Sequence, residues 1–88
     1  MLTLRENIVH TETDYGTALL DERSGQYWML NPTGTLVLRV LLDGGSTAEA
    51  TDSMVRSYDV DATTADRDVQ SLLAELRTAG LVATDTVS

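Results

Sequence analysis

One stretch of the chain reads Gln26-Tyr27-Trp28-Met29-Leu30-Asn31-Pro32-Thr33-Gly34. Its first half is rich in aromatic and large apolar side chains, which favour an extended strand. Asn31 then supplies a side-chain oxygen that can cap a helix, and Pro32 suits the first helical position because the N–H that proline lacks has no partner there. The stretch therefore predicts a strand over 26–30 that leads directly into a helix.

Two segments of similar composition precede this strand, over 8–12 and 17–21. The residues between the three segments, 14–16 and 22–25, include the glycines and small polar residues that tight turns use. Connections this short cannot hold the crossover that parallel strands need. We therefore predict a three-stranded antiparallel meander.

Helical periodicity replaces strand alternation after the junction. Apolar spacing of about 3.6 residues predicts a first helix over 32–43, followed by two glycines. A Ser-x-x-Glu capping box predicts a second helix over 47–58. A third apolar stripe predicts a helix over 63–79, ended by Gly80.

These elements make a small α+β domain of winged helix-turn-helix-like arrangement, with a three-stranded antiparallel sheet followed by three helices. The 88 residues suffice for one domain, so we expect a single domain over 1–88. We expect 81–83 to be a short apolar tail and 84–88 to be loosely held.

The chain carries 14 acidic and 6 basic side chains, a formal net charge of −8. Such a surface repels nucleic-acid phosphates and anionic membranes, so a peptide, a protein or a cation is the expected partner. The lack of cysteine excludes disulfides, thiolate zinc sites and thiol catalysis. The longest apolar run, 36–42, contains Arg39 and is too short to span a membrane, and no secretory signal is recognisable. We expect a soluble cytoplasmic protein.

Residues that could support catalysis or metal binding are few. The one histidine, His10, lies on a predicted strand with no acid and nucleophile at a useful spacing. Four aspartates between positions 59 and 68 resemble part of a calcium-binding loop, but the glycine and terminal glutamate of such a loop are missing. We therefore expect no catalytic residue, no metal site and no cofactor.

A winged helix-turn-helix commonly binds DNA through a late helix. Here the third predicted helix carries Asp66, Asp68 and Glu75 against two arginines, so it lacks the basic stripe that phosphates require. A DNA-binding regulator is therefore the weaker alternative.

Asp52-Ser53-Met54 resembles the Asp-Ser-Leu motif at which acyl-carrier proteins receive phosphopantetheine. In carriers that serine opens a helix of an all-helical bundle, whereas Ser53 falls inside the second predicted helix and a sheet is predicted at the front of the chain. A solvent-facing helical serine is the favoured interpretation, and an acyl-carrier-like protein is a second weak alternative.

The strand over 26–30 keeps one unpaired edge if the three strands pair in order. Tyr27, Trp28, Met29 and Leu30 include no charge or proline that would prevent further pairing. Such an edge is covered by the same chain, used for dimerisation, or open to an extended peptide that adds as a strand. Strand alternation predicts that one pair, Trp28 with Leu30 or Tyr27 with Met29, packs on the helices and the other is at least partly exposed.

The chain resembles the PqqD-like family in three groups of residues: the junction from Gly25 to Gly34, the turn Tyr58-Asp59-Val60-Asp61, and the run from Asp68-Val69 through Leu76 to Gly80-Leu81-Val82. Within that family it is most similar to the stand-alone leader-binding proteins of lasso-peptide biosynthesis, which contain the domain called the RiPP recognition element. The resemblance implies a non-catalytic domain that binds the leader segment of a ribosomally made precursor peptide.

The resemblance also implies which residues hold the leader. The leader would lie as a fourth strand against Tyr27, Trp28, Met29 and Leu30, in a groove closed by the third helix. Asp66 and Asp68 could attract a basic leader, although acidic residues near a helix start also complement the helix dipole. The implied helical wall consists of Val69, Leu72, Leu73 and Leu76, some of which must serve the core instead.

The implied partners carry the chemistry. In lasso systems such a protein presents the precursor to a separate transglutaminase-like cysteine leader peptidase, and an asparagine-synthetase-like cyclase that uses ATP then closes the ring. PqqD-like domains also serve other modified-peptide pathways, so a peptide chaperone of another such pathway is the main alternative.

Overall fold

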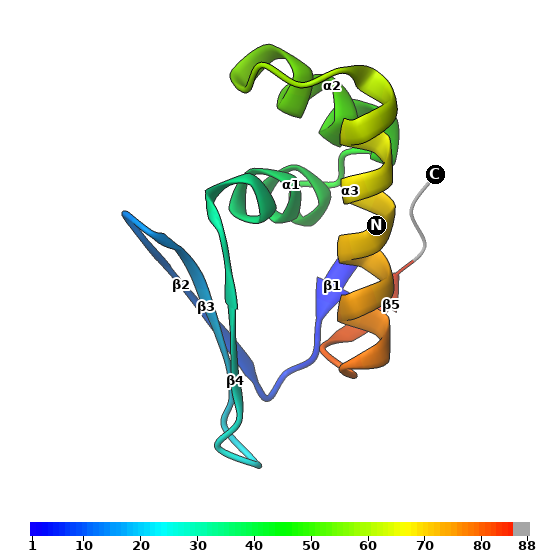
Figure 1. The fold of residues 1–88 in the computed structure, drawn as a ribbon. Coiled ribbons are helices and arrows are strands. Elements are labelled where there is room, and N and C mark those ends of the chain that lie inside the picture. Colours follow the sequence, from blue (N-terminus) through cyan, green and yellow to red (C-terminus); the bar gives the residue numbers. More distant parts are fainter. Residues whose placement is uncertain (86–88) are drawn as a thin grey trace.

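The computed structural model describes residues 1–85. Three helices and two antiparallel sheets, β1–β5 and β2–β3–β4, make up this part of the chain (Figure 1). The predicted α+β fold, with a three-stranded antiparallel sheet followed by three helices, is confirmed. The elements in order are β1 (Leu2–Leu4), β2 (Ile8–Thr13), β3 (Gly16–Asp21), β4 (Tyr27–Leu30), α1 (Pro32–Leu42), α2 (Thr47–Ser57), α3 (Ala62–Thr78) and β5 (Val82–Asp85).

The small sheet of β1 and β5 was not predicted. Leu2 pairs with Asp85 and Leu4 with Val82, so the two strands join the beginning and the end of the described chain. The prediction of an apolar tail over 81–83 is therefore wrong. Of the residues expected to be loosely held, 84 and 85 belong to β5 and 86–88 lie outside the described residues.

The helices begin at the caps that the sequence predicts. The side chain of Asn31 accepts a hydrogen bond from the N–H of Gly34, with 2.8 Å between the heavy atoms, and Pro32 takes the first position of α1. Ser46 and Glu49 form the reciprocal capping box that starts α2. These local signals fix where the chain turns from sheet to helix.

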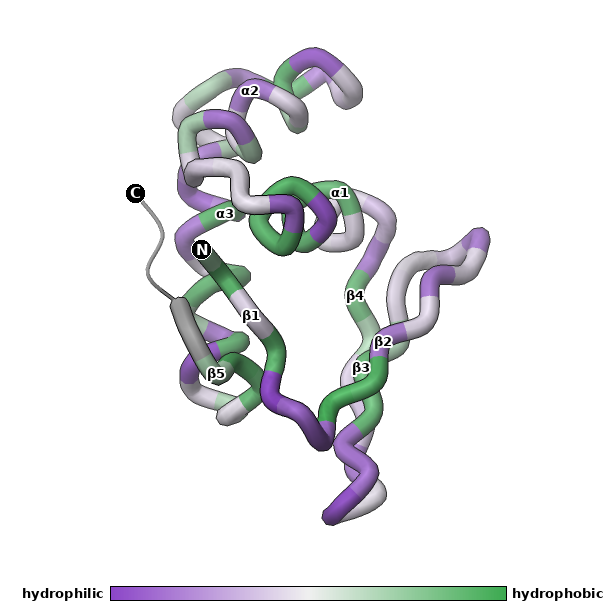
Figure 2. The backbone as a smooth tube through the Cα atoms, turned by 180° about the vertical axis from the view of Figure 1, so that it is seen from behind, coloured by the Kyte–Doolittle hydropathy of each residue, from purple (hydrophilic) through white to green (hydrophobic). Residues whose placement is uncertain are grey.

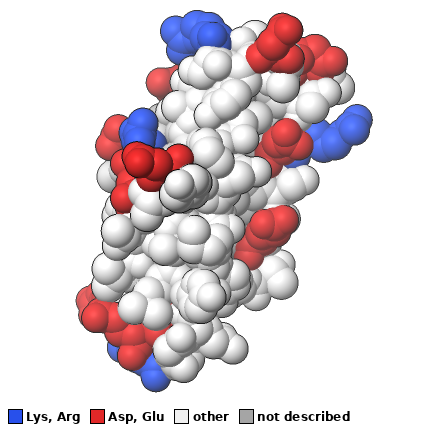
Figure 3. Space-filling view, turned by 60° about the vertical axis from the view of Figure 1, so that its left-hand side comes forward, with Lys and Arg blue, Asp and Glu red and all other residues white. Residues whose placement is uncertain are grey.

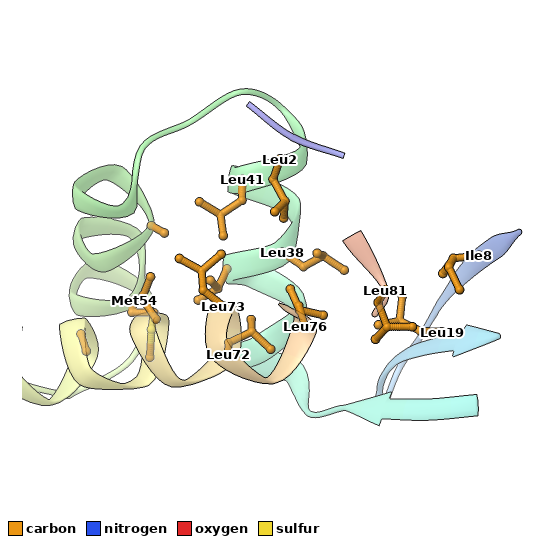
Figure 4. Close-up of a cluster of buried hydrophobic side chains, with 14 residues drawn as sticks. Leu2, Ile8, Leu19, Leu38, Leu41, Met54, Leu72, Leu73, Leu76 and Leu81 are labelled. Atoms are coloured by element: carbon orange, nitrogen blue, oxygen red, sulfur yellow. The ribbon is translucent and has the colours of Figure 1, made fainter. Parts of the chain in front are cut away.

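The hydrophobic core lies between the three helices, the small sheet and the inner face of the β2–β3–β4 sheet (Figure 4). Leu19 of β3, Leu41 of α1 and Leu73 of α3 are at most 2% exposed. In Figure 2, hydrophobic segments of β1 and α1 lie toward the middle of the molecule, whereas the turn between β3 and β4 is hydrophilic. This core holds the sheet at a fixed distance from α3.

Within residues 1–85, none of the helices combines the length and the apolar character that crossing a membrane requires.

Candidate functional site

The free edge of β4 is the first component of the candidate site. In the order β2–β3–β4, β4 pairs with β3 on one side and with no other strand of residues 1–85 on the other. The four residues of β4 include no charge and no proline. Its backbone is therefore open to a further strand.

Hydrogen bonding in the sheet shows which backbone groups of β4 point to that edge. The N–H of Asp21 donates to the carbonyl oxygen of Gln26, with 2.8 Å between nitrogen and oxygen, so these two residues form a hydrogen-bonded pair. Bonded and non-bonded pairs alternate along an antiparallel ladder. The N–H and C=O groups of Tyr27 and Met29 therefore face the free edge.

The side chains of β4 alternate as the sequence predicts. Tyr27 and Met29 are 69% and 55% exposed. Trp28 and Leu30 are half-buried and pack against the core. The inner pair thus joins the sheet to the helices, while the outer pair stays in solvent.

The turn before β4 is held by one carboxylate. Asp21 accepts hydrogen bonds from the side-chain amide of Asn7 at 2.8 Å, from the N–H of Arg23 at 2.9 Å and from the hydroxyl of Ser24 at 3.0 Å. These donors, the Asn7 amide first among them, lower the pKa of the Asp21 carboxyl to about 2. The ionised carboxylate therefore fixes the start of β4 relative to β3.

A groove separates β4 from α3 and forms the second component of the site. Its larger part is a cavity of about 300 Å³, called here the large pocket. The floor is apolar, from Leu30, Val37, Met54 and Leu72, and one wall is the polar start of α1. The opposite wall, from α3, presents Asp68, Ser71 and Glu75.

A second cavity of about 90 Å³, the small pocket, extends this groove toward β5. Trp28, Leu72 and Leu76 line it, together with Leu81. Glu75 is the one charged residue among those that line it within the described chain. The small pocket is therefore suited to an apolar side chain.

The structure brings most of the predicted site residues to this groove. The residues that line one or both pockets are Trp28, Met29, Leu30, Asp68, Leu72 and Leu76. Tyr27, Asp66, Val69 and Leu73 line neither pocket. Val69 and Leu73 are buried in the core, whereas Tyr27 and Asp66 are exposed elsewhere.

Sequence reasoning missed nine lining residues, of which four (Leu19, Val37, Met54 and Leu81) are buried core residues that border a pocket. Ser71 and Glu75 follow Asp68 by three and seven positions, which places all three on one face of α3, so helical spacing could have found them. Asn31, Thr33 and Gly34 belong to the start of α1. They reach the groove because α1 follows β4 without an intervening loop.

The charged side chains that line this groove are acidic. Asp68 and Glu75 line the large pocket, and no arginine lines either pocket within the described residues. At the start of α3, the N–H of Thr64 donates to the Asp61 carboxylate at 2.7 Å and lowers its pKa. The groove therefore favours a ligand that combines apolar groups with positive charge.

No three histidine, aspartate or glutamate side chains gather in a metal-binding arrangement within residues 1–85. His10 and Glu12 line a separate hollow between β2 and α1, away from β4.

The family model described as coenzyme PQQ synthesis protein D (PqqD) matches residues 16–82. No curated protein sequence matches the chain.

Two solved structures share the fold. A structure described as "Lasso peptide synthetase B1 complexed with the leader peptide" is 41% identical, with a TM-score of 0.86, over 94% of this chain and 98% of the other. A structure described as "TbiB1 in Complex with the TbiA(beta) Leader Peptide" is 25% identical, with a TM-score of 0.82, over 96% of this chain and 98% of the other.

Proposed function

This chain belongs to the PqqD family, and on that basis we propose that it binds the leader segment of a ribosomally made precursor peptide. The observation that carries the proposal is the unpaired, charge-free edge of β4 beside a groove with apolar pockets. The two structural relatives were each solved with a leader peptide, which supports the same role here.

The leader adds to β4 as a further strand. Backbone groups of Tyr27 and Met29 face the free edge, so they form the hydrogen bonds that set the register of the leader. Alternate leader side chains then point toward α3. Backbone pairing supplies orientation, and the pockets supply selectivity.

The groove selects leader side chains by shape and charge. Apolar or aromatic side chains fill the small pocket and the floor of the large pocket, where Trp28 and Leu72 offer apolar surface. Asp68 and Glu75 attract basic residues of the leader and raise the rate of encounter. Ordering a disordered leader costs several kcal/mol of free energy, and filling the two pockets of the groove offsets this cost.

The domain itself performs no reaction. It presents the precursor to a separate transglutaminase-like cysteine leader peptidase, and an asparagine-synthetase-like cyclase completes the product. The final product in this proposal is a lasso peptide, and a precursor of another modified-peptide pathway would occupy the same groove.

A fluorescence polarisation titration tests the binding step. A labelled leader, taken from the short open reading frame beside this gene, is titrated with the purified protein at physiological salt, and a scrambled leader is the control. We expect saturable binding in the nanomolar to micromolar range for the authentic leader and much weaker binding for the scrambled one. Equal affinity for both peptides, or no binding, would refute the proposal.

Mass spectrometry tests the non-catalytic role. The precursor is incubated with this protein, with the peptidase, or with both. We expect an unchanged precursor mass with this protein by itself and faster leader removal when both proteins are present. A change of precursor mass with this protein by itself would contradict the assignment.

A further inference from the structure

The outer face of the β2–β3–β4 sheet carries apolar side chains in register across all three strands. Val9 lies opposite Leu20, and Leu20 lies opposite Tyr27. These three side chains are 42%, 40% and 69% exposed. In the neighbouring row, Ala18 lies opposite Met29, which is 55% exposed.

These two rows, called here the outer patch (Val9, Ala18, Leu20, Tyr27 and Met29), lie on the face of the sheet that does not supply the core contacts. The opposite face of the same strands supplies the core contacts, through Leu19 and Trp28. Contiguous exposed apolar side chains on one face are typical of a surface that another protein covers. Figure 3 shows a face of the molecule whose middle is free of charged side chains, with acidic groups and fewer basic groups along its margins.

The charge of the sheet bears on what covers the outer patch. Three exposed acidic side chains, Glu6, Asp14 and Glu22, lie at the ends of the strands, and Arg23 is the one arginine among residues 6–30. Glu12 does not count toward this margin, because it is paired with Arg39 of α1. A second copy of this chain would bring two such acidic margins together, in addition to a net charge of −8 on each copy. The charge therefore favours a different protein, whose own apolar patch is bordered by basic side chains.

The outer patch is also continuous with the leader-binding edge. Tyr27 and Met29 belong to β4, so a leader strand added beside β4 extends the outer face by one strand. Alternate side chains of that strand point to the same side as Tyr27. A protein docked on the outer patch therefore touches this domain and the bound leader together.

We propose that the outer patch is the docking surface of the separate leader peptidase, through an apolar patch on the peptidase that is bordered by basic side chains. This inference rests on the proposed function. Because the peptidase contacts both components, it binds the leader-loaded protein more tightly than the free protein. By thermodynamic reciprocity, the peptidase raises the affinity for the leader by the same factor.

The test uses variants on β2 and β3, outside the β4 edge and the groove. Val9→Glu and Leu20→Glu place a charge inside the outer patch, and neither residue lines the groove. Val55→Glu is the matched control, because Val55 lies on α2 and is 38% exposed, close to the 42% of Val9. Circular dichroism confirms that each variant is folded before binding is measured.

Two affinities are measured for every variant: that of the labelled leader, and that of the purified peptidase encoded beside the precursor gene, with and without leader. We expect Val9→Glu and Leu20→Glu to weaken peptidase binding about tenfold or more, as interface centres do. Leader affinity should stay within about twofold of the original, since the groove is untouched. Val55→Glu should change neither affinity.

Peptidase binding that survives both substitutions, or a peptidase that fails to bind the leader-loaded protein, overturns the docking proposal. Failure of the leader titration instead overturns the proposed function, and the two failures are read from different measurements. Sedimentation equilibrium measures the oligomeric state of the original protein and of Val9→Glu, and it tests whether a second copy covers the outer patch. A dimer of the original protein that Val9→Glu converts to a monomer would assign the outer patch to a second copy.

Discussion

The side-chain oxygens of Thr17 and Thr35 lie 2.7 Å apart in the buried contact between β3 and α1. The Thr35 hydroxyl donates to the carbonyl oxygen of Asn31, with 3.2 Å between the oxygens, so the Thr17 hydroxyl is the donor to Thr35. The two side chains are 1% and 8% exposed. This pair fixes the start of α1, which lines the large pocket, to the central strand of the sheet.

Substitution of these threonines should have unequal effects on the free energy of unfolding. Thr35→Val leaves the buried Thr17 hydroxyl without its acceptor, and we expect a loss of about 2 kcal/mol. Thr17→Val leaves the Thr35 hydroxyl bonded to Asn31, and we expect a loss of about 1 kcal/mol. In urea denaturation, the double variant should lose less than the sum of the two. Strict additivity would show that the two hydroxyls are not coupled.

Met29→Pro should abolish leader binding without unfolding the domain. Proline removes a backbone N–H that points to the free edge of β4, and edge strands tolerate proline at such positions. Met29→Ala is the matched control, because it shortens the side chain and keeps the N–H. Polarisation with labelled leader measures the result, and full affinity in a folded Met29→Pro variant would refute strand addition.

Trp28→Ala should weaken leader binding by about 2 kcal/mol or more, because the indole lines the small pocket. Tyr27→Ala should change leader affinity little, since its side chain lies on the outer face and its backbone is retained. Isothermal titration gives the affinities, and thermal unfolding shows whether each variant is folded. An unchanged affinity in Trp28→Ala would remove the indole from the site.

The double variant Asp68→Asn/Glu75→Gln should bind a basic leader several-fold more weakly at low salt. Each exposed charge contributes about 0.2–1 kcal/mol, and salt should reduce the difference from the original protein. Asp59→Asn/Asp66→Asn removes the same number of charges from exposed residues that line neither pocket. If both double variants lose the same affinity, the overall charge of the protein is responsible and the groove has no special role.

Acid should loosen the turn that leads into β4. The pKa of Asp21 is lowered in the fold from 3.8 to about 2, so its carboxylate stabilises the folded state above pH 3.8, and this contribution is lost as the pH falls toward 2. We expect the urea midpoint of the original protein to fall over that range more steeply than the midpoint of Asp21→Asn. Glu22→Gln is the control, and a similar acid dependence in Asp21→Asn would show that other carboxylates dominate.

Much of the fold follows from local sequence signals. The cap at Asn31, the capping box at Ser46 and the alternation along β4 act over a few residues, and the structure shows each of them. The pairing of β1 with β5 leaves no such signal, because it depends on residues at opposite ends of the described chain. A short strand with a distant partner resembles an apolar tail when only its own residues are considered.

The groove is less predictable than the elements that form it. Helical spacing places Val69, Leu72, Leu73 and Leu76 on one face of α3, but it does not show which of them meet the core and which meet β4. The structure resolves this, because Leu72 and Leu76 line the groove while Val69 and Leu73 do not. The position of β4 relative to α3 is a property of tertiary packing.

The pairing of β1 with β5 also has a consequence during synthesis on the ribosome. Leu81, which lines the small pocket, is held by a 3.0 Å hydrogen bond from the N–H of Arg5 to its carbonyl oxygen, just before β5 begins. Contacts between residues this far apart in sequence form late, and β1 has no partner until residues 82–85 have been made. The small pocket is therefore completed only after nearly the whole described chain has left the ribosome, so a nascent chain cannot capture a leader in full.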